Sequence, residues 1–161
     1  MTFTIQIKDE ITKIEDNLSD SLISLLVYLR FNSAYQNNKL SIYTENASVA
    51  RWLFKSIKSH YNININLTTR TIKRFKKRNI YILSIKNKIN IILNDIDNCL
   101  KNILESSNEE KVAFLKGIFL SCGSINDPKK NGYHLEFLIK EEKDAIIINN
   151  IKKRKRIYGI Y

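Results

Sequence analysis

The residues of this sequence with the clearest chemical potential form two clusters of positive charge. Arg70–Arg78 reads RTIKRFKKR and Lys152–Arg156 reads KKRKR, and neither run contains an acidic residue. Together they carry 11 positive charges, which equals the whole net charge of +11, so the rest of the chain balances 16 basic against 16 acidic residues. Clusters of this kind bind polyanions, of which nucleic acid is the commonest inside cells. The candidate DNA-binding cations are Arg70, Lys73, Arg74, Lys76, Lys77, Arg78, Lys152, Lys153 and Arg154.

Metal or nucleophilic chemistry has little support in the sequence. The histidines, His60 and His134, and the cysteines, Cys99 and Cys122, do not have the spacing of zinc ligands. Cys122 has no His or acidic residue beside it, which a cysteine nucleophile needs, so we interpret it as a small residue at a crowded helix junction. We therefore predict no metal, no cofactor and no small-molecule substrate. Two cysteines are too few for a disulfide framework, which indicates a reduced, cytoplasmic protein.

Length and composition indicate a globular chain that can position these groups. It has 161 residues, of which 43% are hydrophobic and 27% charged, with one Pro and four Gly. That composition favours a folded protein with most residues in helices and strands. No apolar run approaches the ~18 residues that a membrane helix needs. The amino terminus alternates Phe3, Ile5 and Ile7 with polar residues and lacks a secretory signal, so we expect no membrane partner.

The first third of the chain predicts a buried helix followed by two short strands. Asp20–Phe31 is apolar on most of its circumference, which is typical of a buried helix, and Asn17 or Asp20 could cap its start. Short strands are expected near Ser33–Tyr35 and Lys39–Thr44, with a turn at Asn37-Asn38 between them. A second helix, Ala47–His60, is expected to begin at a cap on Asn46 and to pack one apolar face on a core.

The first basic cluster is expected at the tip of a β-hairpin. Tyr61–Leu67 alternates apolar residues with Asn62, Asn64 and Asn66, which predicts a strand with one buried and one polar face. A second strand, Asn79–Ile85, follows the cluster. The three asparagines, together with Lys39 and Ser41, are candidates for a polar sheet face that lies along DNA, although a solvated surface would have the same residues.

The second half of the chain repeats the first about ninety residues later and stops halfway. Its predicted elements are a connecting helix at Lys88–Glu105, an apolar helix at Lys111–Ser121, a turn at Asn126–Pro128, a strand at Tyr133–Ile139 and a last helix from Glu141 to about Arg156. Gly117 and Gly123 are expected where the two apolar helices pack closely. An internal repeat of this kind is the most informative feature of the organisation.

Both apolar helices resemble a known motif. Leu115–Gly123 (LKGIFLSCG) is similar to the LAGLIDADG motif of homing endonucleases, and Leu25–Ser33 is a weaker copy. Further matches narrow the resemblance to the WhiA family of bacterial regulators, whose amino-terminal part is a degenerate version of the endonuclease fold; they are Leu29–Phe31, Thr44–Asn46, Gly123–Pro128 and Tyr133–Glu136. The resemblance covers residues 2–150.

This resemblance implies an α+β fold, a LAGLIDADG-like pseudo-repeat of helix-strand-strand-helix-strand-strand with an incomplete second copy. It divides the chain into a first repeat at 1–87, a connecting helix at 88–110 and a truncated second repeat at 111–161. The family is described as nucleoid-associated DNA-binding regulators of sporulation, cell division and chromosome segregation. Its helix-turn-helix domain is expected to be absent here because the match fades after Ile151, which indicates a fragment or an early gene end.

The resemblance also implies that the chain is not a nuclease. Active LAGLIDADG enzymes hold a divalent metal with one carboxylate at the end of each motif helix, and hard cations need such oxygen ligands. The matching positions are Asn32 and Cys122 here, and the other acid positions are Arg30 and Leu120. No carboxylate is left at either helix end, so we predict no metal site and no enzyme activity.

Three functional hypotheses remain open from the sequence. The first is a DNA-binding regulator without catalytic activity, whose partner is double-stranded DNA. The second is an interaction scaffold that meets another regulatory protein or a second copy of itself, for which an exposed edge strand at Tyr133–Ile139 would serve. The third is an inactive product of a truncated gene. In the second and third hypotheses, the two basic clusters would be exposed to solvent and would bind nothing.

Overall fold

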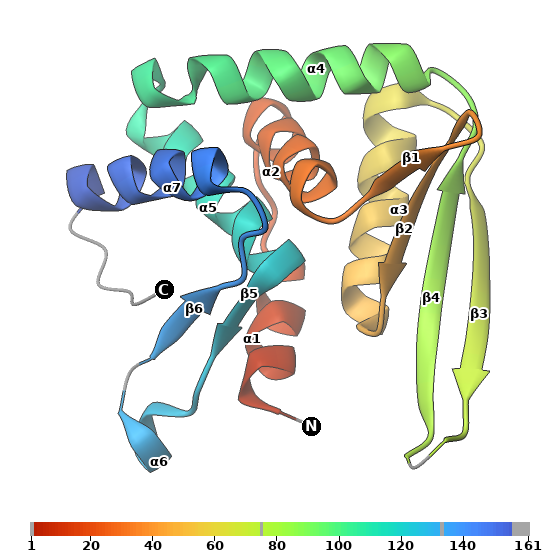
Figure 1. Cartoon of the computed structure of the whole chain (residues 1–161), viewed down its shortest axis with the longest axis horizontal. Coiled ribbons are helices and arrows are strands. Elements are labelled where there is room, and N and C mark those ends of the chain that lie inside the picture. The colour runs from red at the N-terminus through yellow and green to blue at the C-terminus, as the bar shows by residue number, and fades with distance from the viewer. Residues whose placement is uncertain (1, 75, 133, 156–161) are drawn as a thin grey trace.

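The structure is a computed structural model that describes residues 2–74, 76–132 and 134–155, without the side chains of residues 131 and 152–155. Its elements are α1 (Phe3–Thr12), α2 (Leu18–Phe31), β1 (Ala34–Gln36), β2 (Lys39–Thr44), α3 (Ala47–Tyr61), β3 (Asn66–Ile72), β4 (Arg78–Ile85), α4 (Ile89–Asn102), the 3-10 helix η1 (Ile103–Glu105), α5 (Asn108–Cys122), β5 (Gly123–Ile125), α6 (Pro128–Asn131), β6 (Leu135–Phe137) and α7 (Glu142–Lys155). In Figure 1 the sheet with α3 lies on one side of α2, β5, β6 and α7 lie on the other, and α4 runs across both.

The order of elements confirms the predicted α+β pseudo-repeat. The series α2-β1-β2-α3 is repeated as α5-β5-β6-α7, with the short helix α6 inserted between β5 and β6, and β3 and β4 complete the first unit. β1 to β4 form an antiparallel sheet in the order β1-β2-β4-β3, whereas β5 and β6 form a separate antiparallel pair. Asn37 and Asn38 both have positive φ at the β1–β2 turn, a conformation that a two-residue hairpin favours and that Asn tolerates.

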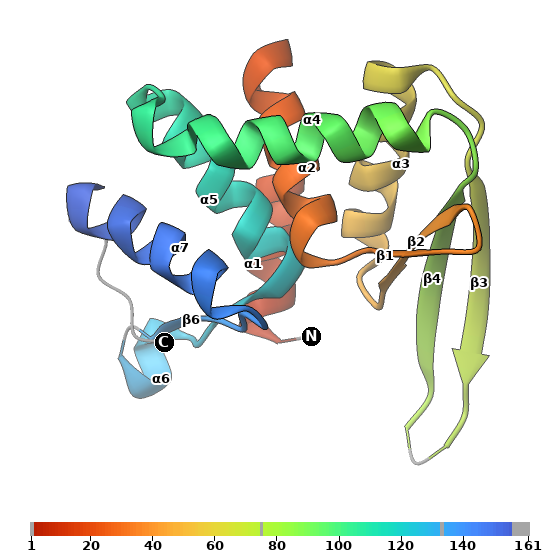
Figure 2. The same ribbon diagram turned by 45° about the horizontal axis from the view of Figure 1, so that its top comes forward.

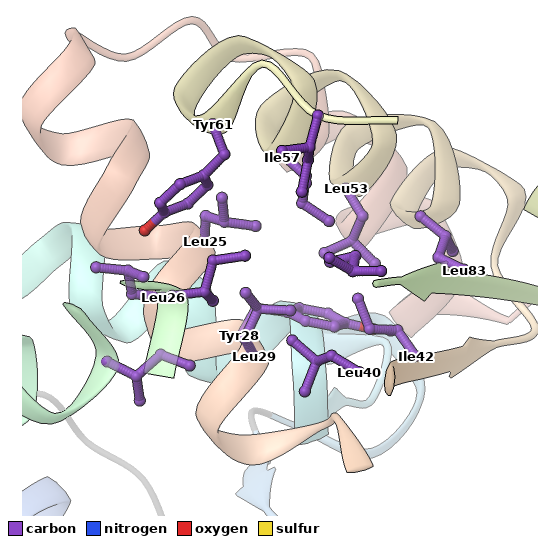
Figure 3. Packing of buried hydrophobic residues seen from close by; sticks show 14 of the residues in the cluster. Leu25, Leu26, Tyr28, Leu29, Leu40, Ile42, Leu53, Ile57, Tyr61 and Leu83 are labelled. Carbon is purple, nitrogen blue, oxygen red and sulfur yellow. The ribbon is translucent and has the colours of Figure 1, made fainter. Parts of the chain in front are cut away.

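The larger core lies between α2, α3 and the inner face of the four-stranded sheet. Leu25 and Leu29 of α2, Leu53 and Ile57 of α3, and Leu83 of β4 are at most 1% exposed. Figure 3 shows these side chains pointing into one space together with the ring of Tyr28. Burial of each such aliphatic side chain contributes roughly 1.5–3 kcal/mol, so this cluster fixes α3 and the sheet against α2.

The two motif helices, α2 and α5, pack against each other at very short range. The Ser24 hydroxyl donates to the backbone carbonyl of Ala113 at 2.8 Å, which joins the helices in the middle of the molecule. A Cβ placed on Gly117 would lie 2.5 Å from the carbonyl oxygen of Ser24 and 2.9 Å from the Cβ of Val27. The prediction that Gly117 lies at a close helix contact is therefore confirmed, because a larger residue has no room there. The same prediction is wrong for Gly123, which is the C-cap of α5 and is crowded by Phe119 of that helix, not by α2.

A second core attaches α7 to this helix pair. Phe114 and Ile118 of α5 pack with Val27 of α2 and with Ile148 and Ile151 of α7, all at most 1% exposed. At its start α7 also forms an ion pair with α2: Arg30 Nη2 lies 3.2 Å from the buried Asp144 carboxylate and 3.3 Å from that of Glu141. The last helix predicted from the sequence is thus confirmed over Glu142–Lys155.

Three details of the predicted elements are wrong. The strand predicted at Tyr61–Leu67 does not form: Tyr61 ends α3, Asn62 follows in the left-handed conformation, and the strand begins at Asn66. The amino-terminal residues form helix α1, capped by Thr2, where the sequence predicted no element. The strand predicted at Tyr133–Ile139 is described only as the shorter β6, Leu135–Phe137.

The start of α3 depends on one side chain, Asn46. Its Oδ1 accepts hydrogen bonds from the backbone N–H groups of Ser48 at 2.9 Å and Val49 at 3.2 Å, as the predicted N-cap should. We expect Asn46→Ala to lower the free energy of unfolding by about 1 kcal/mol because both N–H groups lose their acceptor. Asn46→Asp, which keeps an acceptor oxygen, should stay within about 0.5 kcal/mol of the natural protein. Urea unfolding followed by circular dichroism measures both; equal losses would contradict a capping role.

Candidate nucleic-acid interface

The four-stranded sheet has an inner face that builds the core and an outer face turned away from the helices. Leu40, Ile42, Leu83 and Ile85 of β2 and β4 are buried and lie opposite one another in the register, so they define the inner face. Side chains alternate between faces along a strand. Ser41 lies opposite Ser84, which in turn lies opposite Asn66 of β3, so the outer face begins with polar groups.

The outer face continues as a polar and cationic strip toward the hairpin end. By the register of β2, β4 and β3, its side chains are Lys39, Ser41, Tyr43, Asn66, Thr68, Arg70, Ile72, Arg78, Ile80, Ile82 and Ser84. Most carry a hydroxyl, an amide or a positive charge, and none carries a negative charge. Ser41 is only 8% exposed, so the structure leaves little of this predicted residue open to a ligand. Groups of these types make the hydrogen bonds that proteins direct at phosphates, sugars and base edges.

The β3–β4 hairpin extends this strip beyond the rest of the sheet. β2 pairs with β4 only over Tyr81–Ile85, whereas β3 continues to pair with β4 as far as Arg78. Figures 1 and 2 both show the hairpin projecting past β2 and α3 as an isolated arm. The prediction of a hairpin with the first basic cluster at its end is therefore confirmed.

The cations of this cluster are exposed and, with one exception, have no acidic neighbour within the described residues. Arg70 and Arg78 lie on the two strands, and the other four, Lys73, Arg74, Lys76 and Lys77, lie in the connection between them. The connection is folded back by a hydrogen bond from the Lys76 N–H to the Arg74 carbonyl at 2.8 Å. Clustered cations without acids produce a strong local positive potential, which attracts polyanions.

The exception is Arg78, the first residue of β4, which lies at the outer end of the paired strands next to the connection. Its Nη1 lies 3.0 Å from Oε1 of Glu45, and both side chains are more than half exposed. Glu45 stands between β2 and the cap of α3, so the pair ties the arm to the body of the protein. Sequence reasoning did not select Glu45 as a site residue, because only the pairing of β2 with β4 brings it close to Arg78.

The three asparagines predicted to share one sheet face do not do so. Asn62 is the left-handed residue after α3, with φ of 49°, and Asn64 is exposed in the extended segment before the sheet. Only Asn66 belongs to a strand and lies on the outer face. Tyr43, Thr68 and Ser84 take the places beside it; the sequence did not predict these residues as site members.

The positions that hold metal in active LAGLIDADG helices are occupied by groups that serve the fold. Asn32 ends α2, and its amide donates to the Tyr28 hydroxyl at 2.9 Å. Cys122 ends α5, its thiol donates to the Ile118 carbonyl at 3.4 Å, and burial raises its pKa, which keeps it protonated and unreactive. Leu120 is buried, and no cluster of three or more metal-ligating side chains occurs among residues 2–74, 76–132 and 134–155.

The second basic cluster contributes less to the described site. Lys152, Lys153 and Arg154 belong to the last turns of α7, but their side chains and Arg156 lie outside the described residues. They stay a sequence-based prediction, separate from the sheet and its arm. In the part of the chain that the structure covers, no helix has the length and hydropathy to cross a bilayer.

Comparison with known families gives two matches that together cover most of the chain. Residues 20–97 match the model of the WhiA N-terminal LAGLIDADG-like domain, and residues 111–159 match the model of the WhiA LAGLIDADG-like domain. The first match contains the four-stranded sheet, and the second contains α5 and the elements after it. Both agree with the helix motifs from which the resemblance was drawn.

Individual relatives are similar over nearly the whole chain. The "Probable cell division protein WhiA" of Oceanobacillus iheyensis is 32% identical over 174 residues, which cover 100% of this chain and 54% of the relative. The protein of the same name from Bacillus cytotoxicus is 35% identical over 161 residues, covering 91% and 51%. The chain therefore spans about half the length of the curated relatives that it matches.

Solved structures share the fold. The N-terminal LAGLIDADG domain of DUF199/WhiA superposes with a TM-score of 0.75 at 20% identity, covering 97% of this chain and 76% of that one. Full-length DUF199/WhiA from Thermatoga maritima superposes with a TM-score of 0.70 at 19% identity, covering 98% and 52%. The arrangement of two helix–strand units around a central helix pair is thus that of a LAGLIDADG-like domain.

Proposed function

The chain belongs to the WhiA family, whose two LAGLIDADG-like domain models match most of its length, and we propose that it binds duplex DNA without cleaving it. The arm of β3 and β4 contacts phosphates with its cations, and the outer face of the sheet lies along the same duplex. The observation that carries this proposal is the coincidence of six exposed cations with a polar sheet face free of acids.

The arm and the sheet are expected to contact different parts of the duplex because they carry different side chains. Lys and Arg side chains on a projecting arm reach phosphates, which supply affinity and position but little sequence preference. Asn66, Thr68 and Ser84 carry short polar groups close to the backbone, so they reach base edges or sugars only once the duplex is seated. We therefore expect most of the affinity to come from the arm and to depend strongly on salt.

The proposal includes that the chain does not cleave DNA. The residues at the ends of the two motif helices, α2 and α5, support this part. Asn32 and Cys122 stand where the enzymes need carboxylates, and an amide and a buried thiol do not hold Mg²⁺ in their place. The proposed DNA-binding groups lie on the sheet and the arm, so binding by them does not require carboxylates at the ends of the two motif helices. The fold can therefore serve as a binding module alone.

The names of the relatives, which are probable cell division proteins, support a proposal for the biological role. We propose that the chain takes part in transcriptional regulation linked to cell division and chromosome segregation, and to sporulation in bacteria that sporulate. DNA as partner places it at the nucleoid, in the cytoplasm. These roles are proposed for a chain that spans about half of its relatives' length.

The proposal is tested by fluorescence anisotropy with a labelled duplex of unselected sequence, followed by gel analysis of the same mixtures after incubation with Mg²⁺ or Mn²⁺. We expect saturable binding at low salt and an intact duplex with either metal. Absence of binding at low salt would contradict the binding role. Metal-dependent cleavage that co-purifies with the protein and disappears in a Cys122→Ala variant would contradict the non-catalytic role.

Glu45 gives a sharper prediction, because it neutralises one of the arm's cations. We expect Glu45→Gln to strengthen DNA binding about two- to fivefold at low salt, since Arg78 is released and a negative charge near the phosphates is removed. The matched control is Glu109→Gln, which removes an exposed acid at the start of α5, away from the arm. Anisotropy titrations compare the dissociation constants; weaker binding by Glu45→Gln would mean that the ion pair is needed to hold the arm in place.

A further inference from the structure

A groove of about 340 Å³ lies on α2, α4 and the start of α5. Leu22, Ile23 and Leu26 of α2 and Ile103 of η1 form its apolar part, and Asp95 of α4 and Glu110 of α5 bring carboxylates to it. Leu22 and Ile23 are only half-buried, so apolar surface is accessible within the groove. Its volume is near the lower end of the range for ligand pockets, and spaces between helices are among their common locations.

The charge of this groove is opposite to that of the arm. Asp95 and Glu110 are the charged residues among its described lining, which includes no Lys, Arg or His. The surrounding stretch, residues 95–110, contains five acidic residues and one lysine, Lys101. In a chain with a net charge of +11, this is a local reversal of sign, and it repels phosphates.

Both carboxylates are held in place by neighbours. Asp95 Oδ2 accepts a hydrogen bond from the Tyr61 hydroxyl at 2.7 Å, which joins α4 to the end of α3. Glu110 accepts from the Ser107 hydroxyl at 3.3 Å, while the Glu110 N–H donates to that hydroxyl at 3.2 Å, so the N-cap of α5 also holds the carboxylate. Each carboxylate still has acceptor capacity for a cation, because an ionised carboxylate accepts several hydrogen bonds.

The groove is also far from the proposed DNA-binding arm. Figures 1 and 2 show α4 at the opposite end of the molecule from the arm's tip. A partner in the groove therefore leaves the arm and the outer sheet face accessible. The two surfaces can be occupied at the same time by molecules of opposite charge.

We propose that this groove binds a basic amphipathic peptide segment of a partner protein. An apolar side chain of the segment, such as Leu, covers Leu22 and Ile23, and a Lys or Arg next to it on the same face pairs with Asp95 or Glu110. This is the helix-in-groove mode, in which apolar anchors give affinity and flanking charges set orientation. The acidic character selects a protein over a nucleic acid, and the proposal does not depend on the DNA-binding function.

The first test uses a fluorescently labelled helical peptide with Leu on one face and Lys beside it, and the complete chain. We expect saturable binding that weakens as salt is raised. Asp95→Asn with Glu110→Gln should weaken it about tenfold, because two charge pairs are lost. Both substitutions keep the shape of the side chain. The amide oxygen of Gln at position 110 can still accept from the Ser107 hydroxyl, and the backbone N–H at 110 still donates to that hydroxyl, so the N-cap of α5 is preserved.

Matched controls separate this site from general attraction. Asp97→Asn with Glu109→Gln removes the same charge from neighbouring exposed positions that do not line the groove, and should change the affinity less than threefold. A peptide of equal composition with its Leu residues scrambled around the helix should bind at least about tenfold more weakly. Equal effects of the two double variants, or equal binding of the two peptides, would overturn the proposal, as would absence of saturable binding.

Cys99 provides a second, independent readout, because it lines the groove and is half-buried. Burial raises its pKa to about 11, so alkylation is slow and its rate is easily followed in mildly alkaline buffer. In a Cys122→Ala background, the bound peptide should slow alkylation of Cys99, and the scrambled peptide should not. Binding without protection of Cys99 would place the peptide elsewhere and refute the assignment. The affinity of the Asp95→Asn/Glu110→Gln variant for DNA should equal that of the natural protein. The peptide result can therefore fail or succeed independently of the DNA-binding proposal.

Discussion

Reversing the charge of Lys76 and Lys77 together, by substitution to Glu, is expected to weaken duplex DNA binding about a hundredfold. The two lysines lie at the end of the arm, where neither has an acidic neighbour among the described residues, so their full charge faces solvent. The double reversal reduces the arm from six positive charges to a net charge of about two, which removes phosphate contacts and adds repulsion. Anisotropy titrations with one labelled duplex measure the change.

The control for this prediction reverses two lysines on the other side of the sheet. Lys55 and Lys58 are exposed on α3, the helix that packs on the inner face, and their replacement by Glu makes the same change in net charge. We expect that control to weaken binding less than about threefold. Thermal unfolding should show that both variants are folded. The control also loses the contact of Lys58 Nζ with the Phe54 ring, 5.9 Å from its centroid, so a somewhat lower unfolding temperature is expected for it alone. Equal losses of affinity in the two variants would show that net charge, and not the arm, determines binding.

Gly117→Ala is expected to destabilise the protein by about 1–3 kcal/mol, although alanine is the better helix former. In an open helix the substitution would add about 0.5–1 kcal/mol of stability. Here the new Cβ would lie 2.5 Å from the Ser24 carbonyl oxygen, and a backbone atom of α2 cannot move without separating the two motif helices. Urea unfolding measures the difference in free energy at constant slope.

The sign of that result is diagnostic of the α2–α5 contact. Val112→Ala, on an exposed position of the same helix, should change stability by less than about 0.5 kcal/mol. If Gly117→Ala raised the free energy of unfolding, the higher helix propensity of alanine would outweigh any clash, and the two helices would not be in close contact. A destabilisation restricted to Gly117 would support the packing on which both repeat units depend.

The parts of the fold that could be predicted from the sequence are those determined by local pattern. The helices α2 and α5 were identified because they are apolar on nearly all sides, which occurs only when a helix is enclosed. The cap at Asn46 and the turn at Asn37-Asn38 were predictable because both depend on local interactions. Asn46 accepts a hydrogen bond from a residue two positions later, and the turn depends on the backbone conformation of its own two residues. The basic arm was placed correctly because two strand-like segments flank a run with six cations and no acidic residue.

The start of β3 could not be predicted from the same kind of pattern. Tyr61 and Ile63 are buried and Asn62 and Asn64 exposed, so the alternation is present, but it arises from the end of a helix and an extended segment. Asn62 adopts the left-handed conformation that commonly ends helices, and an asparagine at this place in the pattern is compatible with a helix end as well as with a strand. The true strand, Asn66–Ile72, contains three threonines, whose β-branched side chains favour strands.

The full set of residues on the outer sheet face and the role of Glu45 could not be predicted from the sequence, because both depend on how distant strands align. Tyr43, Thr68 and Ser84 are neighbours only because β2, β4 and β3 pair in one particular alignment, which no local pattern specifies. Helix α1 was missed for a related reason: Ile7 and Ile11 pack at helical spacing on the second core, but Phe3, Ile5 and Ile7 also alternate. Tertiary contacts decide between the two readings.

The distribution of charge connects these results to function. The arm concentrates positive charge at one end of the fold, while the groove of α2, α4 and α5 presents carboxylates at the other. Under the two proposals, this LAGLIDADG-like domain has one surface for DNA and a separate one for a protein. Such an arrangement suits a module that brings a partner to DNA.

The measurement that tests the central claim most directly is the salt dependence of binding to a random duplex of about 30 base pairs. If the arm grips the phosphates, the logarithm of the association constant should fall linearly with the logarithm of salt concentration, with a slope of about −4 to −5, equivalent to roughly four to six phosphate contacts. A slope near zero, or no binding at the lowest salt, would contradict DNA binding by the basic arm.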